Sequence, residues 1–488
     1  MLINLHQERS VRMTEAVEKL VKKSDDPSRW YLQLVRMAKL ADYGPVRGTF
    51  AIRPYGYEIW ERVQRDLDDR FKATGHRNAY FPLLIPESYI KKEAEHVEGF
   101  DPELAWVTIG GREELEERLA IRPTSESIIC DFYKNWIQSY RDLPILINQW
   151  CNVLRWEKVT RPFLRTSEFL WQEGHTVHAT ADEAREETLR MLGVYRDCFY
   201  EAMAIPVLTG AKSPSERFAG AVETYTCEGL MGDGRALQAA TSHDLGQNFA
   251  RAFDITFLDE NQERVHPYQT SWGFSTRTIG GLILVHGDDR GLRLPPRIAP
   301  TQAVIVPIWR GKNKGEVRRE AVALYSELKD SGIRMEVDLD EEHSPGWKFN
   351  EHELRGVPVR VELGPKDIEK GQAVVVRRDT GEKEFLDRKE LPQRLQALMG
   401  EIQENMLRQA ETFREENTRR AESYEEFREI IANKRGFVVA PWDGTEETEQ
   451  KIKEDTKATI RLLPFEREEG KDLVSGKPGQ TAIFARAY

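Results

Sequence analysis

Two neighbouring segments of the chain, 152–157 and 168–178, can be read with a period of two in their hydrophobic and polar positions. Because successive side chains of a β-strand point to opposite faces, this period of two predicts a β-hairpin. The residues expected on one face of it are Val153, Arg155 and Glu157, then Phe169, Trp171, Glu173 and His175. Together with Lys158, Arg161 and Arg165 of the loop, they suit an anionic ligand bound beside a small cationic one.

The same alternation has a simpler interpretation. Arg and Glu often alternate on the solvated face of a half-buried sheet, and Trp and Phe in that register are often core residues. The hairpin alone therefore leaves an active site and an ordinary sheet both open.

Helical periodicity organises the residues before the hairpin. Residues 10–40 read as helical, and residues 57–74 predict a second helix that ends at a Thr-Gly pair. A continuous apolar strand is expected at 80–85 and a short strand at 119–122. The short strand leads into a helix whose plausible N-cap is Thr124.

Two charged residues occupy first turns of predicted helices. Glu126 follows the Thr124 turn, where a carboxylate either complements the helix dipole or binds a cationic ligand. Arg277 follows Ser275, the natural N-cap of an apolar helix, and a cation in that place opposes the dipole. Such departures from local rules tend to mark sites, so an anion is expected near Arg277.

The segment between the hairpin and Arg277 is less regular. Residues 213–235 are rich in Gly, Ser and Glu and are expected to form loops and short strands, whereas 235–243 reads as a strand. Its polar residues Gln238 and His243 could simply end a sheet, because a lone histidine is more often a satisfied core group than a ligand.

A stiff break at residues 295–300, which contain three prolines, predicts a domain boundary. Beyond it, strands and helices alternate with short connections over 303–377, which predicts a small α/β sheet. Residues 388–432 read as charged helices, and residues 436–488 mix apolar strands with Gly and Pro turns.

Composition places the chain among ordinary globular proteins of several domains, with 488 residues, 40% hydrophobic and 31% charged. It contains no run of 18 apolar residues, and its N-terminus lacks an apolar core, so neither a membrane span nor a signal peptide is supported. We therefore expect a cytoplasmic protein.

The net charge of −11 argues against nucleic-acid binding over the whole surface, which leaves local basic patches as the places for any RNA contact. The four cysteines fit neither a disulfide framework nor a metal site by their spacing, and they are most simply core thiols: Cys130, Cys151, Cys198 and Cys227.

Several long motifs occur in one order along the chain: IRPTSES, RWEKVTRPFLRTSEFLWQEGHT, ALQAATSHDLGQNFA, WGFSTRTIGGLILVHGDDRGLRLPP and PGWKFNEHELRGVPVRVELGPKDI. Through them, essentially the whole chain resembles prolyl-tRNA synthetases of the archaeal and eukaryotic type. The resemblance implies three domains. They are an α+β class II catalytic domain at 1–298 with an antiparallel sheet flanked by helices, an α/β anticodon-binding domain at 299–385, and a small α+β C-terminal domain at 386–488.

The implied activity is that of a proline–tRNA ligase. Such an enzyme activates L-proline with ATP and Mg²⁺ to prolyl-adenylate and transfers the prolyl group to the 3′ end of tRNA(Pro), releasing AMP and diphosphate. The resemblance also implies a homodimer. The segment between His178 and Gln238 is too short for an inserted editing domain, so alanine or cysteine charged in error is expected to persist.

Site residues follow from the resemblance position by position. Those implied for proline are Thr124, Glu126, Trp171, Glu173, His175, His243 and Ser275. Those implied for ATP are Arg155, Glu157, Arg165, Thr166, Gln238, Thr241, Ser275 and Arg277, with Arg155 and Arg277 catalytic. Those implied for the anticodon are Phe349, Glu353, Arg360 and Lys366.

The last domain departs from the family pattern. Many relatives hold zinc there with four cysteines, but this chain has no cysteine after Cys227, so no structural zinc is expected. The corresponding positions are Asp443, Thr448, Asp472 and Ser475. The side chains expected to hold the domain by packing instead are Phe437, Trp442, Ile460, Leu462 and Phe465.

Two competing functions remain to be weighed. A catalytically silent paralogue that binds tRNA or a regulatory partner is disfavoured, because it need not keep Arg155, Glu157, Gln238 and Arg277 together. A class II synthetase for threonine or serine is disfavoured by Thr124 with Glu126 and by Trp171 with His175.

Overall fold

The computed structural model describes residues 19–96, 103–309 and 311–488. The helix expected at 10–40 therefore lies partly outside the described residues. Within them, helix α1 spans Pro27–Met37, and the Asp26 side chain accepts a hydrogen bond of 3.0 Å from the Arg29 N–H at its start.

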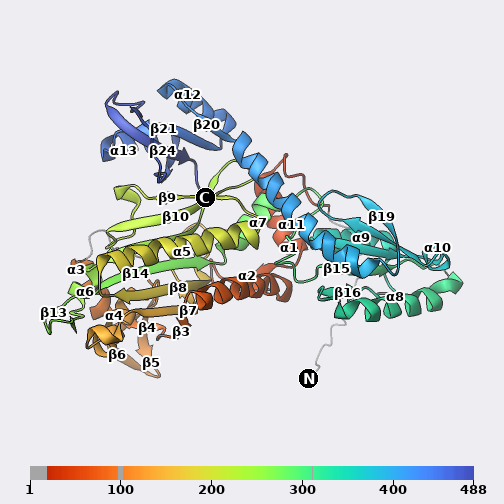
Figure 1. Ribbon diagram of the computed structural model, residues 1–488, viewed down its shortest axis with the longest axis horizontal. Coiled ribbons are helices and arrows are strands. Elements are labelled where there is room, and N and C mark those ends of the chain that lie inside the picture. The colour runs from red at the N-terminus through yellow and green to blue at the C-terminus, as the bar shows by residue number, and fades with distance from the viewer. Residues whose placement is uncertain (1–18, 97–102, 310) are drawn as a thin grey trace, which may run out of the picture.

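A seven-stranded sheet forms the centre of the catalytic part of the chain (Figure 1). Its order is β3-β7-β8-β14-β11-β10-β9, and only β3 and β7 run parallel. The strands are β3 (Arg77–Asn78), β7 (Ile145–Leu154), β8 (Glu168–His178), β9 (Val207–Ala211), β10 (Glu223–Leu230), β11 (Ala236–Gly246) and β14 (Tyr268–Ser275). The antiparallel class II sheet expected from the resemblance is confirmed.

Two long helices pack on one face of this sheet, α2 (Pro54–Ala73) and α5 (Ala181–Glu201). Their apolar stripes meet the sheet at Trp272, whose ring centroid lies 4.8 Å from that of Phe71 and 6.3 Å from that of Tyr195. Thr180 begins α5 with a reciprocal capping box to Glu183. This packing leaves the opposite face of the central strands for polar side chains.

Close approach of two tryptophans explains two glycines on the central strands. A Cβ at Gly174 would lie 2.0 Å from the Trp272 ring, and a Cβ at Gly273 would lie 2.5 Å from the Trp171 ring. Any larger residue would overlap an indole, so these glycines let Trp272 enter the core and Trp171 lie against the polar face.

The predicted hairpin is confirmed on one strand and wrong at the end of the other. Strand β8 carries Phe169, Trp171, Glu173 and His175 at alternating positions as expected. Strand β7 ends at Leu154, so Arg155 and Glu157 lie beyond the ladder rather than on a strand. The Arg155 N–H still binds the Ser167 carbonyl at 2.8 Å in the register of the ladder, but the Trp156 N–H binds the Glu103 carbonyl at 3.0 Å, and this contact takes the chain away from β8.

Two other predictions in this part need correction. Of the strand expected at 80–85, only β4 (Leu84–Pro86) pairs in a sheet, because the preceding Phe81 N–H donates to the Gln149 side chain at 2.6 Å. The segment 213–235, expected to hold loops and short strands, contains the eight-residue strand β10, which lies between β9 and β11. Burial on both faces hides the alternation that marks a half-buried strand.

A second core lies beneath a three-stranded sheet of order β4-β6-β5. There, the Tyr133 hydroxyl donates to the His175 carbonyl at 2.8 Å and so ties the helix after Thr124 to strand β8. The remaining elements of the catalytic part are β1 (Ala41–Tyr43), β2 (Phe50–Ile52), α3 (Glu87–His96), β5 (Trp106–Gly110), β6 (Glu113–Ile121), α4 (Glu126–Trp136), α6 (Asn248–Ala252), β12 (Phe257–Leu258), β13 (Arg264–Val265) and α7 (Arg277–His286).

The next unit is a five-stranded sheet of order β16-β15-β17-β18-β19, parallel across its first three strands and antiparallel beyond. Its elements are β15 (Ala303–Pro307), α8 (Lys314–Leu328), β16 (Met335–Val337), α9 (Pro345–Leu354), β17 (Val359–Leu363), α10 (Pro365–Glu369), β18 (Gln372–Arg377) and β19 (Lys383–Asp387). The α/β alternation expected beyond the prolines is confirmed.

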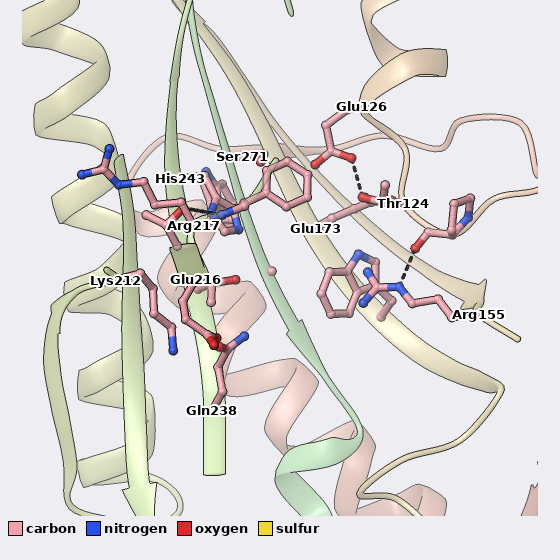
Figure 2. A pocket seen from close by; sticks show the side chains of 17 residues that line it. Thr124, Glu126, Arg155, Glu173, Lys212, Glu216, Arg217, Gln238, His243 and Ser271 are labelled. Carbon is pink, nitrogen blue, oxygen red and sulfur yellow. Dashed lines mark hydrogen bonds between the residues drawn. The ribbon is translucent and has the colours of Figure 1, made fainter. Parts of the chain in front are cut away.

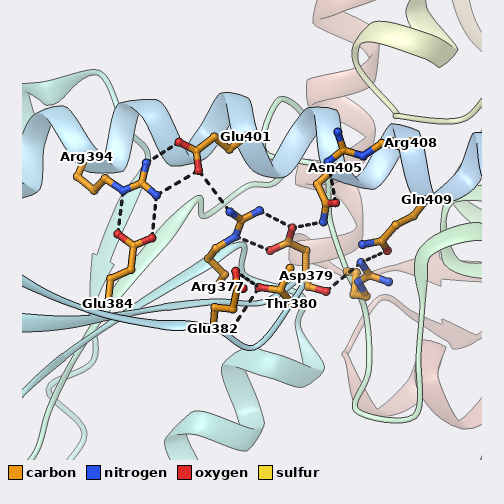
Figure 3. Close-up of polar contacts among 11 residues, drawn as sticks. Arg377, Asp379, Thr380, Glu382, Glu384, Arg394, Glu401, Asn405, Arg408 and Gln409 are labelled. Carbon is orange, nitrogen blue, oxygen red and sulfur yellow. Dashed lines mark hydrogen bonds and ion pairs between the residues drawn. The ribbon is translucent and has the colours of Figure 1, made fainter.

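The long helix α11 (Leu391–Glu416) runs from this sheet toward the last domain (Figure 1). Its buried stripe, which includes Leu395 and Ile402, shares a core with strands β15 and β17. Its polar side binds the end of β18, where Arg377 contacts Asp379 at 2.8 Å and Glu401 of α11 at 3.3 Å (Figure 3).

The C-terminal domain is a mixed sheet of order β20-β21-β24-β22, with β23 paired to β24. Its elements are β20 (Thr418–Arg420), α12 (Tyr424–Glu429), β21 (Phe437–Trp442), α13 (Glu446–Thr456), β22 (Thr459–Leu462), β23 (Glu469–Lys471) and β24 (Pro478–Ala485). Phe437, Trp442, Ile460 and Leu462 are buried as expected, but Phe465 is 57% exposed and stacks on Tyr225 of the catalytic part.

The four positions expected to replace zinc ligands lie together in a hydrogen-bond network. The Asp443 carboxylate accepts from the Thr448 hydroxyl at 2.7 Å and from the Ser475 hydroxyl at 2.8 Å. The buried Asp472 carboxylate accepts from the Asp443 N–H at 3.1 Å. In the described ranges, His, Cys, Asp and Glu form no group of three or more that could hold a metal ion.

No helix in the described parts of the chain combines the length and the apolar character that crossing a membrane requires.

Candidate active site

A cavity of about 420 Å³ opens on the polar face of the central sheet (Figure 2). Strand register builds its floor, because Glu173 of β8 pairs with Gly273 of β14, which pairs with Thr241 of β11. Figure 2 shows Arg155, Thr124 and Glu126 on one side of this cavity and Lys212 and Arg217 on the other. We call it the larger cavity.

The turn into α4 supplies two carboxylate contacts at one end of the larger cavity. The Thr124 hydroxyl donates to Glu126, and the Ser125 hydroxyl donates to Glu173. Thr124 was expected to cap α4, but Ser125 occupies the N-cap position and Thr124 turns to Glu126 instead. Glu126 is 4% exposed and lines the cavity, so a buried carboxylate there faces any bound cation.

Glu173 and His175 form a buried ion pair beside that carboxylate, with 3.1 Å between Glu173 Oε2 and His175 Nε2. Burial opposes charge on both, but the mutual hydrogen bond and attraction outweigh it. They lower the pKa of the Glu173 carboxyl and raise the pKa of the His175 imidazole. Gln149 adds a 2.9 Å hydrogen bond to Glu173, so this pair is fixed before any ligand arrives.

His243 lies on the opposite wall of the larger cavity as a neutral group. Burial and the nearby charge of His175 lower its pKa to about 3. The Phe218 ring lies 4.7 Å from the His243 ring at 34°, and the Thr224 hydroxyl lies 3.0 Å from His243 Nδ1. Phe218 and His243 thus form an uncharged patch on this wall, which fits an apolar ring, beside the charged side chains of Lys212, Glu216 and Arg217.

Four residues that line the larger cavity have a buried polar group without a hydrogen-bond partner in the described part of the chain. The groups are the Trp171 Nε1–H, the Arg217 Nε–H, the Ser271 hydroxyl and the Trp272 Nε1–H. Buried polar groups are almost always hydrogen-bonded, so several unpaired donors around one cavity indicate a ligand with hydrogen-bond acceptors.

A smaller cavity of about 90 Å³ adjoins the larger one and shares Arg155 and Trp171 with it. The Arg155 Nε–H donates to the Pro123 carbonyl at 3.0 Å, and its guanidinium lies 5.5 Å from the Trp171 ring centroid. Arg165 binds Glu157 at 2.7 Å in the same cavity.

Arg277 completes a cluster of three guanidinium groups at the smaller cavity. Ser275 is predicted to be the N-cap of α7, but Thr276 occupies that position; the Ser275 hydroxyl instead accepts a hydrogen bond of 3.2 Å from the Arg277 backbone N–H. Burial, followed by the charges of Arg155 and Arg165, lowers the pKa of Arg277 to about 10. The side chain still carries a full charge at neutral pH, and the three neighbouring cations favour a multivalent anion.

The expected ATP residues all line the smaller cavity: Arg155, Glu157, Arg165, Thr166, Gln238, Thr241, Ser275 and Arg277. Five of the expected proline residues line the larger one: Thr124, Glu126, Trp171, Glu173 and His243. His175 lines neither cavity and reaches the site through Glu173, and Ser275 lines only the smaller one.

Sequence reasoning missed several residues of the larger cavity: Pro123, Lys212, Glu216, Arg217, Phe218, Thr224, Ser271, Trp272 and Gly273. Ser271 and Gly273 share the alternating register of Ser275, so period two could have found them. Lys212 to Phe218 come from a loop whose position no local pattern reveals.

Three of the four expected anticodon residues lie together on the five-stranded unit. Arg360 binds Glu353 at 3.0 Å, and its guanidinium lies 4.1 Å from the Phe349 ring centroid. Lys366 is exposed on α10. A small cavity at Glu353 and Arg360 is also lined by Arg378.

Three family models match the chain. Residues 106–286 match the class II tRNA synthetase core domain for G, H, P, S and T, residues 302–398 match an anticodon binding domain, and residues 424–488 match a prolyl-tRNA synthetase C-terminal domain. The proline–tRNA ligase of Rubrobacter xylanophilus is 86% identical over 98% of this chain and 100% of its own. The chain belongs to the prolyl-tRNA synthetase family.

Other members of the family share the same full length. The proline–tRNA ligase of Natranaerobius thermophilus is 57% identical over 97% of this synthetase and 99% of its own chain, and that of Chlorobium luteolum is 58% identical over 96% and 100%. This synthetase is thus a class II enzyme whose three matched regions follow the order expected from its motifs.

Proposed function

We propose that this synthetase activates L-proline with ATP and transfers the prolyl group to the 3′ end of tRNA(Pro), releasing AMP and diphosphate. One observation carries the proposal beyond family membership. A cavity with three guanidinium groups joins, through Arg155 and Trp171, a cavity with a buried carboxylate and an apolar wall. A triphosphate in the first and an imino acid in the second would meet at Arg155.

For the first step we propose ATP in the smaller cavity. The proline carboxylate attacks the α-phosphate in line and diphosphate leaves, so the protein positions the reactants and neutralises developing charge without a nucleophile of its own. Arg155 and Arg277 are proposed to act on the phosphates. Mg²⁺ would add neutralising charge, and because it binds mainly through phosphates and water, oxygen ligands such as Glu157 and Gln238 suffice.

For proline we propose a pose in the larger cavity that uses its buried carboxylate and two of its unpaired polar groups. The cationic imino group, with two N–H donors, would bind Glu126 and the Thr124 hydroxyl oxygen. The carboxylate would accept hydrogen bonds from Trp171 Nε1 and the Ser271 hydroxyl, which otherwise remain unpaired. His175 is proposed to act by fixing Glu173.

For transfer, we propose that a ribose hydroxyl at the tRNA 3′ end attacks the adenylate while the basic loop after β7 holds the acceptor end. The proposed anticodon residues are Phe349, Glu353, Arg360 and Lys366. The net charge of −11 supports such local contacts rather than a broad basic surface.

We further propose the archaeal and eukaryotic type, because only α5, β9, a short 3-10 helix and β10 separate β8 from β11, which leaves no room for an editing domain.

The proposed domain limits are 1–298, 299–385 and 386–488, with α11 as the connector. A homodimer is supported by exposed aromatic side chains at Tyr80, 71% exposed, and Trp136, 46% exposed. Protein synthesis supports a cytoplasmic location.

An amino-acid-dependent pyrophosphate exchange assay with the purified full chain tests the proposal. Proline should support exchange, whereas threonine and serine should be at least about 100-fold less effective, because a polar side chain would lie unpaired against Phe218 and His243. Exchange with none of the amino acids would favour a silent paralogue. Equal exchange with threonine would refute the assignment of the larger cavity.

A further inference from the structure

The C-terminal domain holds one wall of the larger cavity through a backbone bridge, a buried charge cluster and a buried glutamate. The wall is the segment from Lys212 to Phe218, here called the 212–218 loop, which supplies Lys212, Glu216, Arg217 and Phe218 to the cavity. Figure 2 shows three of these on the side opposite Arg155. The residues that hold this loop lie 234 to 249 positions further along the chain, so these contacts arise from tertiary packing and not from local sequence.

A short two-sided backbone bridge anchors the start of the loop. The Ala211 N–H donates to the Leu463 carbonyl at 2.9 Å, and the Leu463 N–H donates to the Ala211 carbonyl at 2.7 Å. Gly210 permits this approach, because a Cβ there would lie 2.4 Å from the Leu463 carbonyl oxygen. Strand β9 thus pairs with the C-terminal domain where the loop begins.

A buried charge cluster fixes Lys212, the first loop residue in the cavity. Lys212 Nζ donates to Glu228 Oε1 at 3.0 Å and to the Arg461 carbonyl at 3.1 Å. Arg461 of β22 donates two hydrogen bonds to the same Glu228 carboxylate, at 2.9 and 3.1 Å. The three side chains are at most 8% exposed, so each charge depends on the others.

One glutamate of the C-terminal domain holds the middle of the loop. Glu449 of α13 accepts from the Ser213 hydroxyl at 2.8 Å and from the Ser215 hydroxyl at 2.7 Å, one on each carboxylate oxygen. Glu449 is 6% exposed and Ser213 is fully buried. Hydrogen bonds to a buried carboxylate are stronger than hydrogen bonds between neutral groups. This contact therefore restrains the part of the loop around Ser213 and Ser215, which lies next to the cavity.

We infer that the C-terminal domain serves the reaction as a clamp on the 212–218 loop, with Glu449 and Arg461 as positioning residues for the proline end of the site. The inference rests on the proposed function. Neither residue lines the cavity, but both determine where Lys212 and Phe218 lie. Phe218 in turn packs on His243, so a released loop would lose the apolar wall before it disturbed the guanidinium cluster.

The test compares Glu449→Ala with Glu447→Ala, which removes the same charge from an exposed position of the same helix turn. In steady-state pyrophosphate exchange, Glu449→Ala should raise the KM for proline about tenfold while the KM for ATP changes less than about twofold. Glu449→Gln keeps one acceptor oxygen and should recover part of the loss. Glu449→Ala removes the carboxylate that two serine hydroxyls bind and should have a lower thermal midpoint than Glu447→Ala, so the KM values are compared at a temperature at which both variants are folded.

A second variant approaches the contact from the catalytic side. The double variant Ser213→Ala with Ser215→Ala should reproduce the rise in the proline KM. Adding Glu449→Ala should raise it little further, because the three substitutions all remove the same contact between the loop and Glu449. Any of three results would overturn the clamp. The proline KM of Glu449→Ala could equal that of Glu447→Ala, or the effects of Glu449→Ala and of the serine substitutions on the proline KM could be fully additive. The KM for ATP could also rise as much as the KM for proline. Lack of proline-dependent exchange by the unaltered chain would instead overturn the proposed function.

Discussion

At the scale of single residues, neighbours decide which groups in the two cavities carry charge. His243, with a pKa of about 3, is neutral at physiological pH, whereas Arg277, with a pKa of about 10, stays charged despite burial. The smaller cavity therefore concentrates positive charge, whereas His243 and Phe218 give the larger cavity an uncharged patch. Arg155 lies between them, and its accessible guanidinium faces both.

Arg155→Ala should lower the rate of pyrophosphate exchange by about 100-fold or more, because it removes a charge-assisted donor from the transferring phosphate. Arg155→Lys should recover only part of the rate, since an ammonium cannot reproduce a planar fork. Thermal unfolding should change little in both variants, because the residue is solvent-accessible. Near-normal exchange by folded Arg155→Ala would contradict the assignment.

At the scale of elements, side-chain hydrogen bonds to Asp443 hold the start of α13. Burial alone would raise the pKa of Asp443, but hydrogen bonds from Thr448, Thr445 and Ser475 outweigh it and lower the pKa from 3.8 to about 2. Because the pKa of Asp443 is lower in the folded chain than in the unfolded chain, its ionised carboxylate increases the free energy of unfolding above about pH 4. This contribution is lost as the pH falls toward 2.

Asp443→Asn should remove this acid-dependent stability. The residue is partly solvent-screened, so the local unfolding free energy at pH 7 should fall by about 1 kcal/mol. Hydrogen exchange of peptides covering 443–456, corrected for intrinsic rates, would measure it between pH 7 and pH 3. The difference between the original chain and the variant should shrink on acidification, and a constant difference would show that the carboxylate charge is not the cause.

At the scale of the whole molecule, one arginine joins the anticodon-binding unit to the catalytic part. Arg378, with a side chain 3% exposed, binds both carboxylate oxygens of Asp288 at 2.6 and 2.8 Å, just beyond the end of α7. Its Nε–H donates to the Glu353 carbonyl at 3.1 Å, and Glu353 binds Arg360. The proposed anticodon surface is thus fixed to the helix that begins with Arg277.

Asp288→Asn should weaken this junction and lower the kcat/KM for charging tRNA(Pro) about tenfold, because a buried guanidinium loses its paired charge. Pyrophosphate exchange, which needs no tRNA, should stay within about twofold. Asp289→Asn is the matched control, since Asp289 binds the Lys23 N–H instead. Equal losses in both assays would mean that Asp288 supports the catalytic part itself.

Local pattern predicted much of the fold and part of the site. Helix α2, strand β8 and the α/β alternation after the prolines were correct, because their apolar spacing matches one secondary structure. Strand β10 was missed because burial on both faces removes alternation, and β7 was extended too far because a tertiary hydrogen bond of the Trp156 N–H, not a residue type, ends it.

The sequence by itself determined the chemistry that each strand could offer, since residue type and the period of two place Trp171, Glu173 and Ser275 on one face. It also determined family membership through the order of its motifs. Only the tertiary structure decided which of these groups share a cavity and which act from behind it, as His175 does. The reason is physical: strand register and contacts between distant segments, such as Glu449 with Ser213, depend on how whole elements pack and leave no periodic trace in the chain.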